Sequence, residues 1–285
     1  MGESRGVLCT NCRKLISSEE QRCPHCGARR PAALSGLRSW SNASPAQVIQ
    51  VVVNLSVVLY AVTLIADPSQ IFNVDLRSIW GLLGIGSPST RGLYLMGMTG
   101  GLAWICGHWW TLLTATFLHG SLLHIFFNLY WLRLLGPVLV AEQGIARFVI
   151  VYMLTGVSGF ALSNFWSGSP TIGASCSVFG LMGVLIVYGR KRGGRFGDGL
   201  SQQVTAWAIA TFLISFMIPH VNNAGHVGGF LGGLALGGLM AARPRPPGRP
   251  LVLLAIALVV ATAVSFGLAG WHMWMPYQTG LAVCS

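Results

Sequence analysis

The chain has 285 residues, of which 53% are hydrophobic and only 9% charged, and its formal net charge is +11. Because about a quarter of the residues in a soluble domain are charged, this composition excludes an ordinary soluble protein and predicts an all-α polytopic membrane protein. The positive charge does not indicate nucleic acid as a partner, since the basic residues cluster between apolar segments, as they do in cytoplasmic loops.

The N-terminal segment contains two Cys-x-x-Cys pairs separated by a short polar stretch. The four cysteines are Cys9, Cys12, Cys23 and Cys26. Four thiolates with this spacing can close a tetrahedral zinc site, and the metal would supply much of the folding energy of so small a segment. We therefore predict a zinc ribbon with structural zinc over residues 1–30, and a linker rich in Pro, Ser and Ala over residues 31–46. His25 is surplus to four cysteines, and surface cysteines without metal are the alternative.

Seven apolar segments long enough to cross a membrane follow the linker. They lie near residues 47–66, 112–136, 147–166, 174–189, 203–218, 225–242 and 250–270. The fourth is short, which favours a helix that begins below the membrane surface, at the end of a re-entrant loop. The connection over residues 67–111 is rich in tryptophan and glycine, so we expect it to lie partly in the membrane interface.

The distribution of basic residues predicts the orientation of the chain. Sixteen of the 18 lysines and arginines fall on one side of the seven spans, and only Arg77 and Arg91 fall on the other. By the positive-inside rule, the N-terminus and the ribbon are cytoplasmic and the C-terminus lies outside, in the inner (plasma) membrane of the cell. No signal peptide is expected, because no apolar stretch follows the first basic residues. In the reducing cytoplasm, the paired cysteines favour metal over disulfides.

Ser175 opens the fourth predicted span, where unpaired N–H groups and the helix dipole favour an oxyanion. His226 begins the sixth span and should face outward at the same depth. Glycines such as Gly229 and Gly233, together with small residues on the fourth span, allow close approach of the two helices. We therefore expect the Ser175 hydroxyl and the His226 imidazole to meet within hydrogen-bond reach. Taken alone, each residue is more typical of packing or of the membrane interface.

Phe179 lies one helical turn after Ser175 and is expected to stack on the ring of His226. No acidic residue lies within a predicted span on the outer side. The pair would therefore be a Ser–His dyad without the third carboxylate of a triad.

His124 and Asn128 are spaced i, i+4 in the second predicted span, so they share one helix face. With the backbone N–H of Ser175, both side chains could donate to an oxyanion. Hydrogen bonding between helices is the alternative for Asn128. His119 precedes the span and is expected to organise the preceding loop.

These motifs together resemble the rhomboid family of intramembrane serine proteases. The pattern is Gly-x-Ser opening one span, His-x-x-x-Asn on the second, and Ala-Gly-His-x-Gly-Gly later. The resemblance implies a six-helix rhomboid core, here within residues 47–245, and residues 246–285 would add a seventh C-terminal transmembrane helix. It also implies Ser175 as nucleophile, His226 as general base, and His124 and Asn128 as oxyanion donors. No cofactor is implied for catalysis, and the partners would be transmembrane protein substrates within the lipid bilayer.

Two positions depart from the family pattern. Cys176 replaces the glycine that usually follows the nucleophile, where a side chain is expected to crowd the oxyanion hole or shift the helix start. Thr111 follows Trp110, where the family usually has arginine. These departures leave open a catalytically impaired pseudoprotease that binds transmembrane clients. A transporter that uses the polar residues as a path is disfavoured, because no inverted repeat is visible.

Two further hypotheses concern partners and substrate access. The ribbon is expected to dock a cytoplasmic protein partner or to regulate the core. The fifth predicted span, with Trp207, Phe212 and Met217, is the candidate lateral gate that admits a substrate helix.

Overall fold

The computed structural model describes residues 6–9, 14–17, 19–27, 44–70, 81, 84–219, 221–242 and 247–279. The chain divides into two compact units, Met1–Gln47 and Val48–Ser285.

The N-terminal unit contains a small antiparallel hairpin. Strand β1 (Gly6–Leu8) pairs with β2 (Leu15–Ser17), and Leu8 lies opposite Leu15. Its buried cluster consists of Ile16 and two of the predicted metal ligands, Cys9 and Cys23. So small an apolar core cannot offset the conformational entropy of folding, so further stabilisation is needed.

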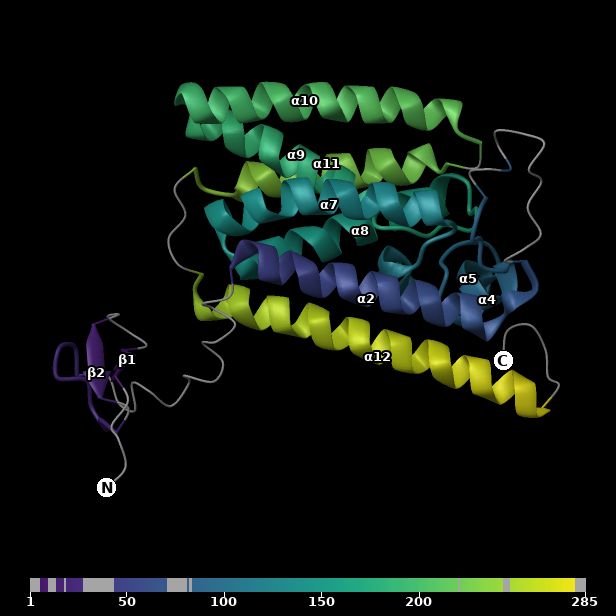
Figure 1. Ribbon diagram of the computed structural model, residues 1–285, viewed down its shortest axis with the longest axis horizontal. Helices are drawn as coiled ribbons and strands as arrows, with labels where there is room; N and C mark the ends of the chain where they lie inside the picture. The colour runs from purple at the N-terminus through teal and green to yellow at the C-terminus, as the bar shows by residue number, and fades with distance from the viewer. Residues whose placement is uncertain are drawn as a thin grey trace. The chain divides into compact units, whose positions relative to one another are not determined.

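The second unit is built from seven long helices. They are α2 (Pro45–Ala66), α7 (Leu122–Gln143), α8 (Ile145–Trp166), α9 (Ser175–Arg192), α10 (Gly194–Met217), α11 (Asn223–Leu239) and α12 (Arg249–Thr279). Each predicted span corresponds to one of them. Among the described residues, five are long and apolar enough to cross a membrane, namely α2, α7, α8, α10 and α12. The other two, α9 and α11, lie in the middle of the helical unit, between α10 on one side and α2 and α12 on the other (Figure 1).

Helices α9 and α11 approach each other at backbone distance. A Cβ atom added at Gly233 would lie 2.1 Å from the carbonyl oxygen of Gly180, and one added at Gly229 would lie 2.1 Å from that of Cys176. Only glycine permits this packing, in which backbone of one helix rests on backbone of the other. The predicted contact between the glycine faces of the fourth and sixth spans is therefore present.

Two helix starts differ from the sequence prediction. Helix α7 begins at Leu122 instead of near residue 112, because the preceding residues form a separate short helix α6 (Thr111–Thr114) and a 3₁₀ turn η2 (Ala115–Phe117). Ser121 then caps α7 by accepting a hydrogen bond from the backbone N–H of His124 at 3.2 Å. Helix α10 begins at Gly194, nine residues before the predicted span that starts at residue 203. Its first turns are polar, so the apolar pattern did not include them.

The connection between α2 and α7 is partly helical. It contains η1 (Pro68–Gln70), α4 (Thr90–Leu95) and α5 (Gly101–Ile105). Ser89 caps α4 and donates a hydrogen bond to Asp67 at 2.7 Å, which helps to hold the pKa of that carboxyl below its usual value. Trp109 is 65% exposed and Ile105 is 78% exposed, as expected of a segment that lies in the membrane interface. Trp80, which falls in the same predicted segment, lies outside the described residues.

Candidate active site

Ser175 is the first residue of α9, and a glycine turn sets its position. Gly173 has φ +115°, and its N–H donates to the carbonyl oxygen of Ala115 at 2.9 Å, which ties the turn to η2. A Cβ atom at this position would lie 2.6 Å from Nε2 of His124. Only glycine therefore allows the turn to pass this close to the histidine.

The predicted contact between Ser175 and His226 is present. Nε2 of His226 lies 3.0 Å from Oγ of Ser175, within hydrogen-bond distance. The Phe179 ring stacks on the imidazole with a centroid separation of 4.5 Å and an interplanar angle of 27°, also as expected. His226 is only 7% exposed, so its ring is held between protein groups. If Nε2 accepts a hydrogen bond from Ser175, the proton of the neutral ring lies on the other nitrogen, Nδ1.

His124 and Asn128 converge on the turn that precedes Ser175. Nδ1 of His124 accepts a hydrogen bond from the backbone N–H of Gly120 at 3.1 Å, which leaves the proton on Nε2, the atom facing Gly173. Nδ2 of Asn128 donates one hydrogen bond to the carbonyl oxygen of His124 at 2.8 Å, and its second proton remains to be donated. The structure therefore brings all four predicted site residues, Ser175, His226, His124 and Asn128, to one end of the helical unit. His119 packs edge-on against His124, with ring centroids 5.3 Å apart.

The match to known proteins covers this same part of the chain. A family model for the rhomboid domain matches residues 106–243. The chain is 29% identical to the rhomboid protease GluP of Bacillus subtilis (strain 168) over 187 residues, which are 66% of this chain and 37% of that protein. It is also 31% identical to the putative rhomboid protease YdcA of the same organism. That match extends over 134 residues, which are 46% of this chain and 66% of YdcA. The chain belongs to the rhomboid family.

The predicted family and its all-α fold class are therefore confirmed, with α12 as the seventh helix after the six-helix rhomboid core. The chain spans less than half the length of GluP. It is also 31% identical to the inactive RHOMBOID-like protein 8 of Arabidopsis thaliana. That match extends over 140 residues, which are 46% of this chain and 39% of that protein. The rhomboid family thus includes a protein named as inactive, so membership of the family does not by itself establish protease activity.

The side chain of Cys176 packs between helices at the start of α9. Its side chain is 2% exposed and packs with Ala115 and Phe160. Cβ atoms added at Gly159 and Gly225 would lie 2.8 Å and 3.0 Å from its sulfur, so the thiol fills a slot between two glycines of α8 and α11. The rotation of α9 that brings Ser175 to His226 turns the next side chain, about 100° around the helix, into this slot. The structure thus accommodates a side chain directly after Ser175.

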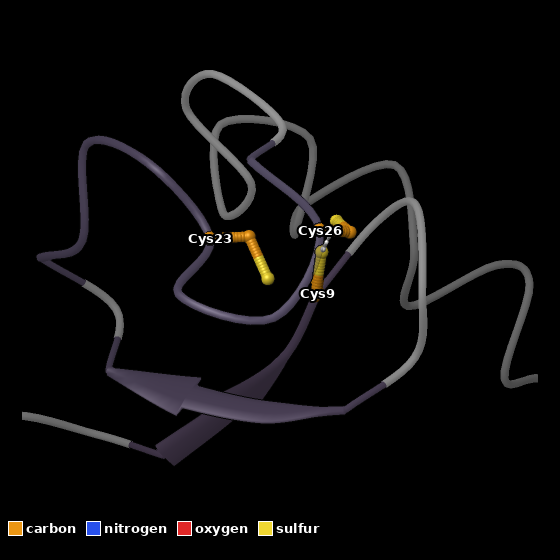
Figure 2. Close-up of side chains that lie close together, drawn as sticks. All are labelled: Cys9, Cys23 and Cys26. Carbon is orange, nitrogen blue, oxygen red and sulfur yellow. Dashed lines mark hydrogen bonds between the residues drawn. The ribbon is translucent and has the colours of Figure 1, made fainter.

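Three of the four predicted metal ligands lie together in the N-terminal unit. The sulfur atoms of Cys9, Cys23 and Cys26 are all within 4.8 Å of one another, and those of Cys9 and Cys26 are 3.7 Å apart (Figure 2). Zinc–sulfur bonds of about 2.3 Å in a tetrahedral site separate two sulfur atoms by about 3.8 Å, so the arrangement can hold a metal ion. Cys12 lies outside the described residues, and His25 is not part of the group that the described residues form.

Sequence reasoning missed a group of polar residues near the dyad. Asn222, Ser163 and Thr171 are hydrogen-bonded to one another, although they come from α11, α8 and the turn before α9. The only local signal was the position of Asn222 three residues before a predicted span, where asparagine is a favoured N-cap.

Proposed function

We propose that this rhomboid is an intramembrane serine endopeptidase that cleaves transmembrane segments of other membrane proteins. The observation that carries the proposal is the 3.0 Å separation of Ser175 Oγ and His226 Nε2 at a helix N-terminus. His226 accepts the hydroxyl proton as Oγ attacks the carbonyl carbon of the scissile peptide bond. The imidazolium then returns the proton to the leaving amine, and water hydrolyses the acyl-enzyme with His226 again as general base.

The oxyanion of the tetrahedral intermediate would be held by three donors. They are Nε2–H of His124, Nδ2–H of Asn128 and the backbone N–H of Ser175. Removal of one such donor typically costs about 3 kcal/mol of transition-state stabilisation. Among the described residues no carboxylate bonds to Nδ1 of His226, and the stacked ring of Phe179 would orient the base by restricting rotation of the imidazole.

The proposed chemistry is tested by labelling with a fluorophosphonate probe in liposomes, since the probe reacts with activated serines. We expect labelling of the wild type and none of the Ser175→Ala variant. A folded wild type that stays unlabelled would refute the endopeptidase and favour the alternative, a pseudoprotease that binds transmembrane clients without cutting them.

We further propose that the dyad faces outward, that the N-terminus is cytoplasmic, and that the membrane is the inner (plasma) membrane. Two observations support this orientation. Three basic residues, Arg190, Lys191 and Arg192, lie at the opposite end of α9 from Ser175. Cys106, in the loop on the dyad side, is disulfide-bonded, and disulfides persist in oxidising compartments.

Substrate entry is proposed between α7 and α10. Across this seam the rings of Trp131 and Trp207 lie 5.5 Å apart, and Phe212 of α10 reaches Phe179, the ring stacked on the base. An aromatic pair contributes about 0.5–1.5 kcal/mol beyond its buried area, so breaking it would favour an open seam roughly two- to tenfold.

Trp207→Ala is therefore expected to raise the cleavage rate of a transmembrane substrate roughly two- to tenfold. Labelling of Ser175 by the small fluorophosphonate probe should not change, because the probe does not need the seam. The matched control is Trp271→Ala on α12, a residue that is 59% exposed. Equal rates for Trp207→Ala and the wild type would contradict entry at this seam.

For the N-terminal unit we propose structural zinc held by Cys9, Cys12, Cys23 and Cys26, with a cytoplasmic protein as the partner of the ribbon. The purified full chain is expected to contain about one zinc ion, measured by elemental analysis. Cys23→Ser should lose most of this zinc, and the ribbon should become sensitive to protease, because binding of the metal is linked to folding. Cys176→Ser is the matched control and should retain the metal. Zinc content unaffected by Cys23→Ser would contradict the site.

A further inference from the structure

A partly buried polar cluster of Asn222, Ser163 and Thr171 joins the segment that carries Ser175 to the helix that carries His226. At its centre Nδ2 of Asn222 donates to Oγ1 of Thr171 at 2.8 Å and to Oγ of Ser163 at 2.5 Å. The two hydroxyls are themselves 3.2 Å apart. Ser163 is fully buried and Thr171 is 8% exposed, whereas Asn222 is half-buried, so its two hydrogen bonds are partly buried.

Both ends of this cluster lead directly to the dyad. Thr171 precedes Ser175 by four residues, and the intervening turn is fixed by the bond from Gly173 to Ala115. Asn222 precedes His226 by four residues, and its Oδ1 accepts a hydrogen bond from the N–H of Gly225 at 3.1 Å, which caps α11. A single carboxamide therefore holds the nucleophile's turn with its nitrogen and the histidine's helix with its oxygen.

The cluster extends to the loop between α4 and α5. Thr99 and Thr171 exchange two backbone hydrogen bonds, of 2.8 and 3.3 Å. Oγ1 of Thr99 also accepts a hydrogen bond from Nδ2 of Asn164 on α8 at 3.1 Å. The turn before Ser175 is thus held from two sides, and Asn222 is the side chain that connects it to α11.

We propose that Asn222 is a positioning residue that sets the distance between Ser175 Oγ and His226 Nε2. This inference rests on the proposed function of the dyad. The physical reason is the steep dependence of proton transfer on geometry, since displacement of a reacting group by about 1 Å can lower a rate about a hundredfold. Asn222 itself touches neither the substrate nor the reacting atoms.

The two roles of the Asn222 side chain can be separated by one substitution. In Asn222→Ser the hydroxyl still caps α11, because serine is a favoured N-cap, but it carries no amide to donate to Ser163 and Thr171. We expect kcat for a transmembrane substrate and the fluorophosphonate labelling rate each to fall at least about tenfold. KM and the midpoint of thermal unfolding should stay close to the wild-type values.

A double-mutant cycle tests whether Asn222 acts through its hydrogen bond to Thr171. Thr171→Val removes the acceptor and keeps the side-chain shape, so it should lower the labelling rate in the same way. The loss in the double variant should be smaller than the sum of the two single losses, because both single variants remove the bond from Asn222 to Thr171. Ser167→Ala is the matched control, since its hydroxyl lies in the same loop and bonds only to Ser163 O and Ser169 N.

The outcomes distinguish this inference from the proposed function. A wild type that is labelled, together with an Asn222→Ser variant labelled at the same rate, overturns the inference alone. A fall in labelling that merely follows a lower unfolding midpoint also overturns it, because Asn222 would then be only structural. A folded wild type that is never labelled overturns the proposed function, and the inference with it.

Discussion

Alanine at Ser175 or at His226 is expected to lower kcat/KM for a transmembrane substrate by about 10⁴-fold or more. The serine hydroxyl is a weak nucleophile unless the imidazole 3.0 Å away accepts its proton. Without the serine, the imidazole has no nucleophile to activate. The double variant should therefore retain the same residual rate as each single variant. Cleavage in liposomes, quantified by separation of the products, measures all three.

The matched control for this experiment is Ser177→Ala. Ser177 is fully buried and donates its hydroxyl to the carbonyl oxygen of Tyr152 at 2.5 Å, so it lies on α9 but away from the dyad. Its cleavage rate should stay within a few-fold of the wild type. Retained cleavage in Ser175→Ala, or additive losses in the double variant, would show that the two groups do not act as one unit.

The meeting of Ser175 and His226 could be predicted from sequence because local features determine it. Each residue lies at the start of a predicted helix, and the number of spans between them places both at the same end. The glycines of α9 and α11 then leave few ways for the two helices to pack except in direct contact. The stacking of Phe179 on His226 follows from the same geometry, since its spacing from Ser175 is one helical turn.

Other features could not be read from the sequence, because they depend on how separate segments pack. The side chain of Cys176 can be buried only because glycines of α8 and α11 leave a slot for it. Helix α7 starts ten residues later than its apolar pattern suggests, since Ser121 caps it after a 3₁₀ turn that is equally apolar. The hydrogen bonds of Asn222 join it to residues 51 and 59 positions earlier in the chain, and the periodicity of a local segment cannot predict contacts over such separations.

Gly233→Ala is expected to destabilise the helical unit strongly. The added methyl group would lie 2.1 Å from the carbonyl oxygen of Gly180, and backbone cannot move aside as a flexible side chain can. Overpacking typically costs about 1–3 kcal/mol, and we expect the upper end of this range. Relief of the clash would separate α9 from α11, so the labelling rate of Ser175 should fall together with the midpoint of thermal unfolding.

Gly238→Ala provides the control within the same helix. No atom lies within 4 Å of a Cβ at this position, so only the helix propensity changes, and alanine is favoured by up to about 1 kcal/mol. Gly238→Ala should therefore unfold at or above the wild-type midpoint and be labelled normally. Because the two variants add the same methyl group to one helix, their difference isolates the approach of α11 to α9. If Gly233→Ala were as stable as Gly238→Ala, the backbone contact that brings His226 to Ser175 would not exist in the membrane.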